Sequence, residues 1–426
     1  MRYFQNTSWM MGEQFLRIIA GLFVGVWVAR YLGPEEFGLF SYVLAFTSLF
    51  GGIAKLGLDS IMVRELVSHP ENRDTYLSTA FWLKVIGAII VMGLIAAIVP
   101  FTSNDTTTNL FIFIIASGLV FQSFEVVEFY FQAQVLAKIV SICKVTQLAL
   151  SSVIKIYLVL NEAELIYFVL VTAFDAFSLA CSYFIAYKIR KNTALFKHFD
   201  WIIAKELLKN SWPLVFIAIF TTLYARIDQV MIKVLLGEYE VGLYSAAIRL
   251  TEAWLFVPVI ISASLFPAIL AAKKISKTLY EDRLIKLYTL LVLVGLAVCL
   301  FTTGFSELII RILFGEAFSE GSNVLSIRIW ETFFAAIGVA SGKWIVAENL
   351  QRLTVKIIVA GALINIGLNY ILIPIFSIEG AALASLISII LTVIVLPYLI
   401  IELRGDVTMR VKAIFLIGLY KLVYKK

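Results

Sequence analysis

Long apolar runs separated by short polar segments recur along the whole chain. Each run reaches the length of about 20 residues that an α-helix needs to cross a bilayer. Between the runs stand turn-forming sequences, such as LGP at residues 32–34 and PEN at residues 70–72. The pattern therefore predicts an all-α integral membrane protein of about twelve transmembrane helices. The predicted helices are 9–31, 38–58, 76–100, 108–133, 139–160, 163–187, 210–236, 242–271, 281–304, 324–346, 354–376 and 379–402.

A ten-residue pattern occurs twice in the sequence. Residues 32–41 read LGPEEFGLFS and residues 236–245 read LGEYEVGLYS, so both fit L-G-x-x-E-x-G-L-aromatic-S. The copies are about half a chain and six predicted helices apart, an even number, so both face the same side of the membrane. Parallel repeats of this kind are typical of two-bundle transporters. We therefore predict an N-terminal six-helix bundle at residues 1–190, a cytoplasmic linker at 191–209 and a C-terminal six-helix bundle at 210–404.

Polar segments that are rich in basic residues alternate along the chain with polar segments that contain few of them. If the N-terminus is cytoplasmic, the lysines and arginines of the polar segments lie almost entirely on the inside, and acidic residues dominate the outside loops. Cytoplasmic loops of membrane proteins are enriched in Lys and Arg, so we predict that both termini are cytoplasmic. Residues 405–426 form a basic tail, for which an interfacial helix on the cytoplasmic leaflet and a tail without function are equally supported.

The composition mainly excludes other classes of protein and site. Of the 426 residues, 61% are hydrophobic and 15% are charged, against roughly 45–50% and 25% in soluble domains. The three cysteines lie inside apolar runs and the two histidines lie in polar loops. Because no cluster of metal ligands or nucleophile–base pair is present, we expect neither a metal nor a cofactor. The net charge of +6 comes from basic residues between apolar runs, which does not indicate nucleic-acid binding.

Ionisable residues also lie inside the predicted helices, where a charge is costly unless it is paired or hydrated. One interpretation is a wet, partly cationic cavity, and the other is a set of structural ion pairs and snorkelling side chains. For the whole set we favour the cavity. The groups expected to bind an anion there are Arg17, Lys84, Arg226 and Arg249. The acids that could bind a coupling proton or sodium ion, or only balance charge, are Glu125, Glu128, Asp175 and Asp228. Snorkelling is the leading interpretation for Lys55, Asp59, Lys144 and Lys343.

Three segments resemble a known family. Residues 29–38, ARYLGPEEFG, resemble the first-loop signature of bacterial polysaccharide exporters. DQVMI at residues 228–232, followed by GLYSAA at 242–247, resembles their helix seven to eight segment. NYILIP at residues 369–374, with GAALAS at 380–385, resembles their penultimate loop. Spacing and helix number agree across essentially the entire chain. By this resemblance the chain is identified as a member of the Wzx-type O-antigen flippases of the MOP superfamily.

The resemblance implies a specific activity and location. Such proteins translocate undecaprenyl-diphosphate-linked oligosaccharide units across the bacterial inner membrane for the assembly of O-antigen and related surface polysaccharides. It implies two six-helix bundles around a V-shaped central cavity. The implied partners are the lipid-linked oligosaccharide, membrane lipids, and a polysaccharide polymerase with its chain-length regulator. Of the family's functional residues only Asp228 is carried over, and a structural role for it stays open.

Two other functions are weighed against the flippase. A cation-coupled exporter of the MATE type would need a mainly acidic cavity, whereas Arg and Lys match or exceed the acids inside the predicted helices. A membrane-embedded polysaccharide polymerase or ligase commonly carries a large outside loop, whereas the longest one predicted here is residues 305–323. The sequence therefore favours a transporter and not an enzyme.

Overall fold

Helices account for nearly all of the structure. It is a computed structural model that describes residues 2–190 and 196–415, and no β-strand occurs among these residues. Ten helical segments of the described chain are long and apolar enough to cross a membrane. Two of them, Ser8–Lys55 and Gln351–Leu399, have 48 and 49 residues, about twice what one crossing needs. Each is broken near its middle by a non-helical residue, Gly33 or Ser377, which brings the number of crossings to about twelve. The predicted fold class is thereby confirmed.

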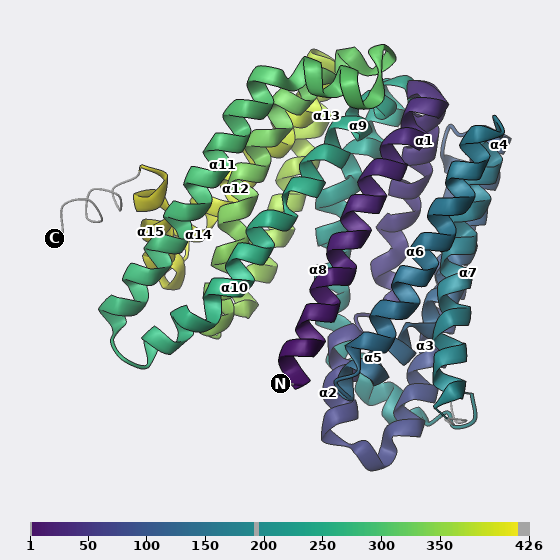
Figure 1. Cartoon of the computed structure of the whole chain (residues 1–426), viewed down its shortest axis with the longest axis vertical. Helices are drawn as coiled ribbons and strands as arrows, with labels where there is room; N and C mark the ends of the chain where they lie inside the picture. Colours follow the sequence, from purple (N-terminus) through teal and green to yellow (C-terminus); the bar gives the residue numbers. More distant parts are fainter. Residues whose placement is uncertain (1, 191–195, 416–426) are drawn as a thin grey trace. The chain divides into compact units, whose positions relative to one another are not determined.

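The chain divides into two compact units, Met1–Val230 and Met231–Lys426. Figure 1 shows the first unit in purple to teal, with the long helix α1 packed beside α6. Its helices are α1 (Arg2–Lys55), α2 (Asp59–Ser68), α3 (Arg73–Ile98), α4 (Thr106–Phe121), α5 (Glu125–Ala133), α6 (Ala137–Leu160), α7 (Leu165–Ile189) and most of α8 (Trp201–Leu235). An apolar core joins α2, α3, α5, α7 and the start of α8 through fully buried side chains such as Met62, Leu77, Val127 and Leu207.

The second unit has its own helices and its own core. The helices are α9 (Glu238–Trp254), α10 (Phe256–Lys273), α11 (Lys277–Phe314), α12 (Ser322–Ala347), α13 (Gln351–Ile390), α14 (Leu396–Leu399) and α15 (Arg404–Ile414). A π-helical turn, Leu391–Val395, separates α13 from α14. The core is centred on α11 and α12, where Leu284, Tyr288 and Ile337 are fully buried.

The two copies of the sequence repeat have similar local backbones. Gly33 has φ 73° and ψ 173°, and Gly237 has φ 130° and ψ −176°. Both positive φ values lie in the region that favours glycine, so each helix can end and the next begin without a long loop. The aromatic residues of the two copies, Phe40 and Tyr244, are both buried. The repeat found in the sequence is therefore also a repeat of backbone conformation.

The predicted linker is helical over much of its length. Residues 191–195 lie outside the described chain, residues 196–200 are non-helical, and α8 begins at Trp201, inside the predicted range 191–209. The Asp200 side chain caps α8 by accepting hydrogen bonds from the backbone N–H groups of Ile202 and Ile203, at 2.7 and 3.0 Å. The backbone N–H of Asp200 donates to Thr79 on α3, at 3.1 Å. Capping by Asp200 thus explains why helix α8 starts before the apolar run does.

The first part of the C-terminal tail packs onto the second unit. Residues 416–426, the second half of the predicted tail at 405–426, lie outside the described chain. Helix α15 contacts α11, and its Asp406 and Arg410 are 0% and 2% exposed. Arg410 binds the Asp406 carboxylate, the Ser341 hydroxyl and the Val393 carbonyl of the π-helical turn. Tyr288 of α11 donates a further hydrogen bond to Asp406. A buried polar network therefore anchors α15.

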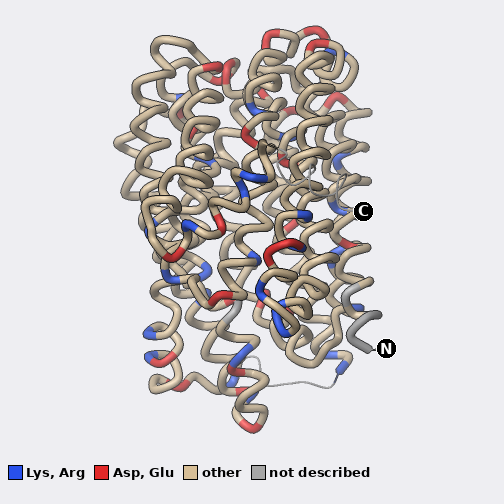
Figure 2. The backbone as a smooth tube through the Cα atoms, turned by 90° about the vertical axis from the view of Figure 1, so that its left-hand side faces the viewer, with Lys and Arg blue, Asp and Glu red and all other residues tan. Residues whose placement is uncertain are grey.

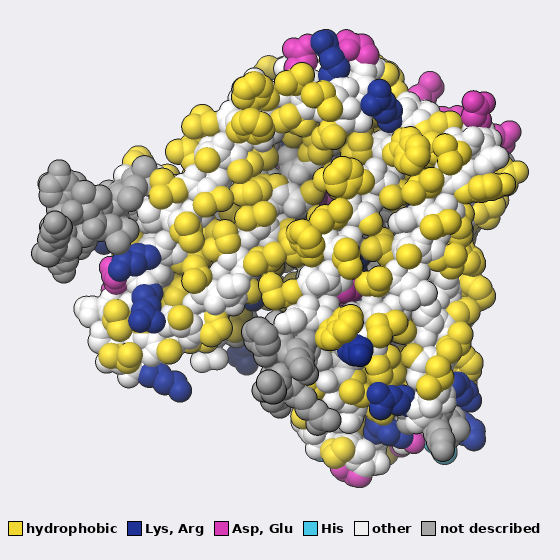
Figure 3. Space-filling model, in the orientation of Figure 1, with side chains coloured by type: hydrophobic (Ala, Val, Ile, Leu, Met, Phe, Trp, Pro, Cys, Tyr) yellow, Lys and Arg dark blue, Asp and Glu magenta, His cyan; other side chains and the backbone are white. Residues whose placement is uncertain are grey.

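Apolar side chains cover much of the lateral surface. In the first unit, Phe23, Ile90 and Val153 are among the large apolar side chains that are more than half exposed. Figure 3 shows that hydrophobic side chains lie along the helices, while many charged side chains gather near helix ends. A surface of this kind suits contact with lipid, because water is replaced by hydrocarbon around the apolar faces. The protein is therefore a multi-pass membrane protein.

Candidate functional site

Charged residues also occur along the middle of helices, as Figure 2 shows by the blue and red segments of the tube. One of the most buried of those in the first unit is Lys84 of α3, whose side chain is 2% exposed. Its Nζ lies 2.8 Å from Oε2 of Glu125 on α5. Lys55, at the end of α1, binds Oε1 of the same carboxylate at 3.2 Å. Glu125 therefore bridges two lysines that belong to different helices.

Further groups complete the surroundings of Lys84. The Asp59 carboxylate lies 3.7 Å from the Lys84 Nζ, within ion-pair range and beyond hydrogen-bond distance. The same ammonium group lies 5.1 Å from the ring centre of Phe129, a cation–π contact. Two lysines and two carboxylates thus form a charge-balanced group, called here the Lys84 cluster: Lys55, Asp59, Lys84 and Glu125.

A second group lies one helical turn further along α5. One oxygen of Glu128 accepts hydrogen bonds from Lys144 of α6 at 2.6 Å and from Gln132 at 3.0 Å. The other oxygen accepts the hydroxyl of Tyr183 on α7 at 2.7 Å. Residues three apart on a helix share a face, so Glu125 and Glu128 place both groups on one side of α5.

Two of the predicted site residues, the acid Asp175 and the cation Arg17, each lie in an ion pair with a single partner. Lys155 of α6 contacts Asp175 of α7 at 3.0 Å, and both side chains are about one quarter exposed. Arg17 contacts Glu13, four residues earlier on the same helix, at 3.1 Å, and Arg17 itself is half exposed. The Lys155–Asp175 pair joins two different helices, α6 and α7.

The other predicted site residues lie on α8 and α9. Asp228 is 1% exposed, and its Oδ1 accepts the backbone N–H of Gln229 at 2.8 Å. Arg226 on α8 and Arg249 on α9 are partly buried. In the described part of the chain, no group of three or more His, Cys, Asp or Glu residues could hold a metal ion.

The structure corrects one interpretation and adds residues that the sequence did not mark. Lys55 and Lys144, expected to snorkel, are instead bound to Glu125 and Glu128. Tyr183 and Gln132 also bind Glu128. Nothing in the sequence marked Tyr183, because a tyrosine in an apolar run is common in buried helices. Their contacts with Glu128, from α7 and from α5 itself, identify both residues as parts of the candidate site.

Exchanging the charges of Lys155 and Asp175 tests whether this pair is structural. Lys155→Asp or Asp175→Lys alone places like charges about 3 Å apart, so we expect each single variant to accumulate poorly in the membrane. The double exchange restores the attraction and should restore abundance. Normal abundance of both single variants would contradict a structural pair. Lys277→Glu is the matched control, because that lysine is 88% exposed.

Long apolar helices that also carry paired charges define a multi-pass membrane protein with ionic groups between its helices. A model of the family described as polysaccharide biosynthesis protein matches residues 3–273, more than half of the chain. The chain therefore belongs to the polysaccharide biosynthesis protein family. A MatE family model also matches residues 213–371.

Three relatives are similar over most of their length. The chain is 24% identical to the capsular polysaccharide biosynthesis protein CapF of Staphylococcus aureus, over 90% of this chain and 96% of that protein. It is 25% identical to the probable low-salt glycan biosynthesis flippase Agl15 of Haloferax volcanii, over 87% and 78%. It is 24% identical to a putative O-antigen transporter of Shigella flexneri, over 94% and 98%.

Solved structures identify the fold. An inward-facing multidrug resistance MATE family transporter of the MOP superfamily has a TM-score of 0.71 at 15% identity, covering 96% of both chains. The lipid II flippase MurJ, in an inward closed conformation, has a TM-score of 0.68 at 16% identity, covering 97% of this chain and 92% of MurJ. The fold is therefore that of the MOP superfamily, as the sequence resemblance implied.

Proposed function

We propose that the protein is a flippase that moves undecaprenyl-diphosphate-linked oligosaccharide units across the bacterial inner membrane. Membership of the polysaccharide biosynthesis family supports a role in surface polysaccharide assembly. The relatives named as a glycan flippase and an O-antigen transporter support transport. The observation that carries the proposal is the Lys84 cluster, because it holds two lysines on Glu125 between apolar helices. In this proposal an anionic head group takes the place of that carboxylate.

The proposed mechanism is an exchange of ion pairs. The diphosphate of the lipid would compete with Glu125 for Lys84, and Arg17, Arg226 and Arg249 would supply further cations. Guanidinium groups suit phosphate oxygens because their N–H donors match them in pairs. Carboxylates released from lysine then become able to take up a proton or a sodium ion. In this mechanism Glu125, Glu128, Asp175 and Asp228 would couple substrate binding to an ion gradient.

Alternating access would complete the transport cycle. The sugar and diphosphate would pass through a hydrated cavity while the apolar chain stays in the bilayer, and the two halves would open in turn to each side. Both termini would be cytoplasmic, and a polysaccharide polymerase with its chain-length regulator would use the product outside. The protein itself would make and break no covalent bond, so it is proposed as a transporter and not as an enzyme.

Removing two arginines tests the anion-binding role. We expect the double variant Arg226→Ala/Arg249→Ala to lose transport of lipid-linked oligosaccharide in cells or vesicles, at normal abundance, because phosphate loses its bidentate donors. The matched control is Arg64→Ala/Arg311→Ala, since both side chains are at least half exposed and lie near helix ends. Full transport by the first double variant would remove the case for an anion-binding cavity.

A cation-coupled exporter is the second candidate. The MatE match at residues 213–371 favours it. The fold likeness to a MATE transporter is compatible with either function. A deletion strain separates them: increased susceptibility to cationic drugs with normal surface polysaccharide would favour the exporter, and loss of surface polysaccharide alone would favour the flippase.

A further inference from the structure

A groove inside the first unit lies between the start of α1 and the start of α6, apart from the Lys84 cluster. It has a volume of about 650 Å³, which is within the range of roughly 300–1,000 Å³ that is typical of ligand pockets. Its lining residues are Ser8, Trp9, Gly12, Glu13 and Leu16 of α1 and Lys138, Ser141, Ile142, Val145 and Thr146 of α6. Both sets are spaced three or four residues apart, so each forms one stripe along its helix.

Small residues keep this groove open. A Cβ atom added at Gly12 would meet no atom within 4 Å. Ser8, Ser141 and Thr146 also present short side chains to the groove. The helix ends are tied together beside it, because the Asn6 side chain accepts a hydrogen bond from the backbone N–H of Ala137 at 2.6 Å. The gap therefore persists between two helices whose starts are held in register.

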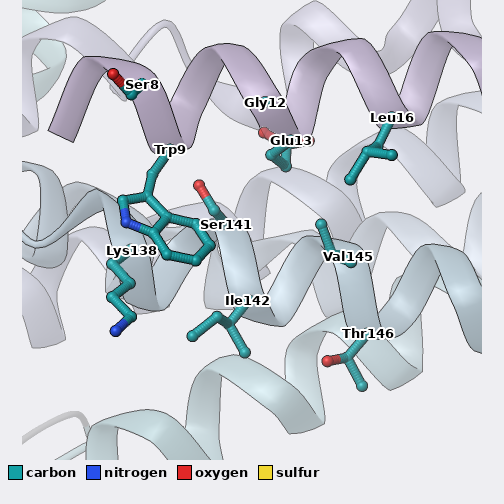
Figure 4. A pocket seen from close by; sticks show the side chains of 10 residues that line it. All are labelled: Ser8, Trp9, Gly12, Glu13, Leu16, Lys138, Ser141, Ile142, Val145 and Thr146. Atoms are coloured by element: carbon teal, nitrogen blue, oxygen red, sulfur yellow. The ribbon is translucent and has the colours of Figure 1, made fainter. Parts of the chain in front are cut away.

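The two ends of the groove differ in chemistry. Figure 4 shows Trp9 of α1 directed toward Lys138 of α6, with Leu16 and Val145 further along the same gap. The Lys138 Nζ lies 5.4 Å from the ring centre of Trp9. Tryptophan and lysine are enriched at the membrane–water interface, where they meet lipid head groups. The acid Glu13 also lines the groove, but Arg17 lies 3.1 Å from its carboxylate.

This combination suits an anionic lipid. Lys138 offers a cation at the head-group end, and Leu16, Ile142 and Val145 offer an apolar channel toward the bilayer centre. The stripe from Ser8 to Leu16 extends about 12 Å along the helix axis, enough for the first part of a lipid chain but not for all of it. The remainder would stay among the membrane lipids.

We propose that this groove holds the lipid carrier of the substrate, with its phosphate at Lys138 and the beginning of its isoprenoid chain along Leu16, Ile142 and Val145. The inference rests on the proposed flippase function and on its cytoplasmic N-terminus. It assigns the tail a track within the first unit, from which the diphosphate passes from Lys138 to the cations of the proposed exchange. One of these cations, Arg17, lies beside the groove on Glu13. The groove thus guides the lipid while the head group is exchanged between ion pairs.

Filling the groove tests this assignment. Ile142→Trp fills it from α6, and Gly12→Leu fills it from α1 at a position with open space and with a gain in helix propensity. The full-length protein would be purified in detergent and titrated with undecaprenyl phosphate, with bound lipid measured by native mass spectrometry. We expect both variants to bind this probe at least about tenfold more weakly. Ile185→Trp on α7 is the matched control, since Ile185 is 57% exposed and Ile142 is 47% exposed.

Phosphatidylglycerol, titrated in parallel, distinguishes the carrier from ordinary membrane lipid. Unchanged binding of phosphatidylglycerol with weakened binding of undecaprenyl phosphate supports the assignment. Equal weakening of both lipids, or no weakening of either, overturns it. If the groove-filled variants also transport at the control rate, the groove is not the track, while the flippase function still stands or falls with the Arg226 and Arg249 variants.

Discussion

Replacing Arg410 with alanine is expected to lower the stability of the protein by about 3–5 kcal/mol, the cost of breaking a buried ion pair by removing one partner. Arg410 is 2% exposed and Asp406 is 0% exposed. The substitution leaves the Asp406 carboxylate buried with only Tyr288 and Ser341 as hydrogen-bond partners. It also removes the guanidinium group that donates a hydrogen bond to the backbone carbonyl of Val393 in the π-helical turn.

The measurement is the melting temperature of the purified protein in detergent, together with its abundance in the membrane. Arg404→Ala is the control, because Arg404 is an exposed residue of the same helix that binds the Tyr398 carbonyl at 3.0 Å. The double variant Arg410→Met/Asp406→Leu should be more stable than Arg410→Ala, since it removes both charges at once. An unchanged melting temperature for Arg410→Ala would show that the network does not anchor α15.

Replacing Lys84 with methionine is expected to reduce both stability and transport. Methionine keeps the length of the side chain but loses the 2.8 Å bond to Glu125 and the cation contact with Phe129. A hydrogen bond to a charged group contributes about 1.5–3 kcal/mol. Glu125 keeps Lys55, so we expect a lowered melting temperature and not complete unfolding.

The double variant Lys84→Met/Glu125→Gln separates the structural role of Lys84 from its proposed role in transport. It also neutralises Glu125, which in Lys84→Met keeps Lys55 alone, so it should regain much of the stability that Lys84→Met loses. If the Lys84–Glu125 pair acts in transport as proposed, transport stays low although stability returns. If transport recovers together with stability, Lys84 serves only the fold. The measurements are melting temperature and transport of lipid-linked oligosaccharide in cells expressing equal amounts of each variant.

Sequence spacing identifies charge pairs only within a helix. Glu13 and Arg17 are four residues apart, and the structure confirms their contact. Lys84 and Glu125 are 41 residues apart, and Lys155 and Asp175 are 20 residues apart. Such contacts depend on which helices are neighbours and how each is rotated, and neither property follows from apolar runs. The partners of Glu125 and Glu128 were therefore beyond sequence reasoning.

The tail illustrates the same limit for a single residue. Because Arg410 follows the last apolar run, the sequence places it in the basic, cytoplasmic tail. The structure buries it beside Asp406, which lies four residues earlier on α15. That spacing was available in the sequence, but burial depended on the carbonyl of Val393 and the hydroxyl of Ser341 from other elements.

The sequence by itself determined the membrane class, the approximate number of helices and the repeated turn at Gly33 and Gly237. The reason is that bilayer thickness sets the length of every apolar run, and positive φ values restrict the choice of residue locally. Only the tertiary structure decided which cations meet which carboxylates, and where a groove stays open between α1 and α6. Those features depend on the packing of helices far apart in the chain, where a side chain's neighbours are set by geometry and not by its position in the sequence.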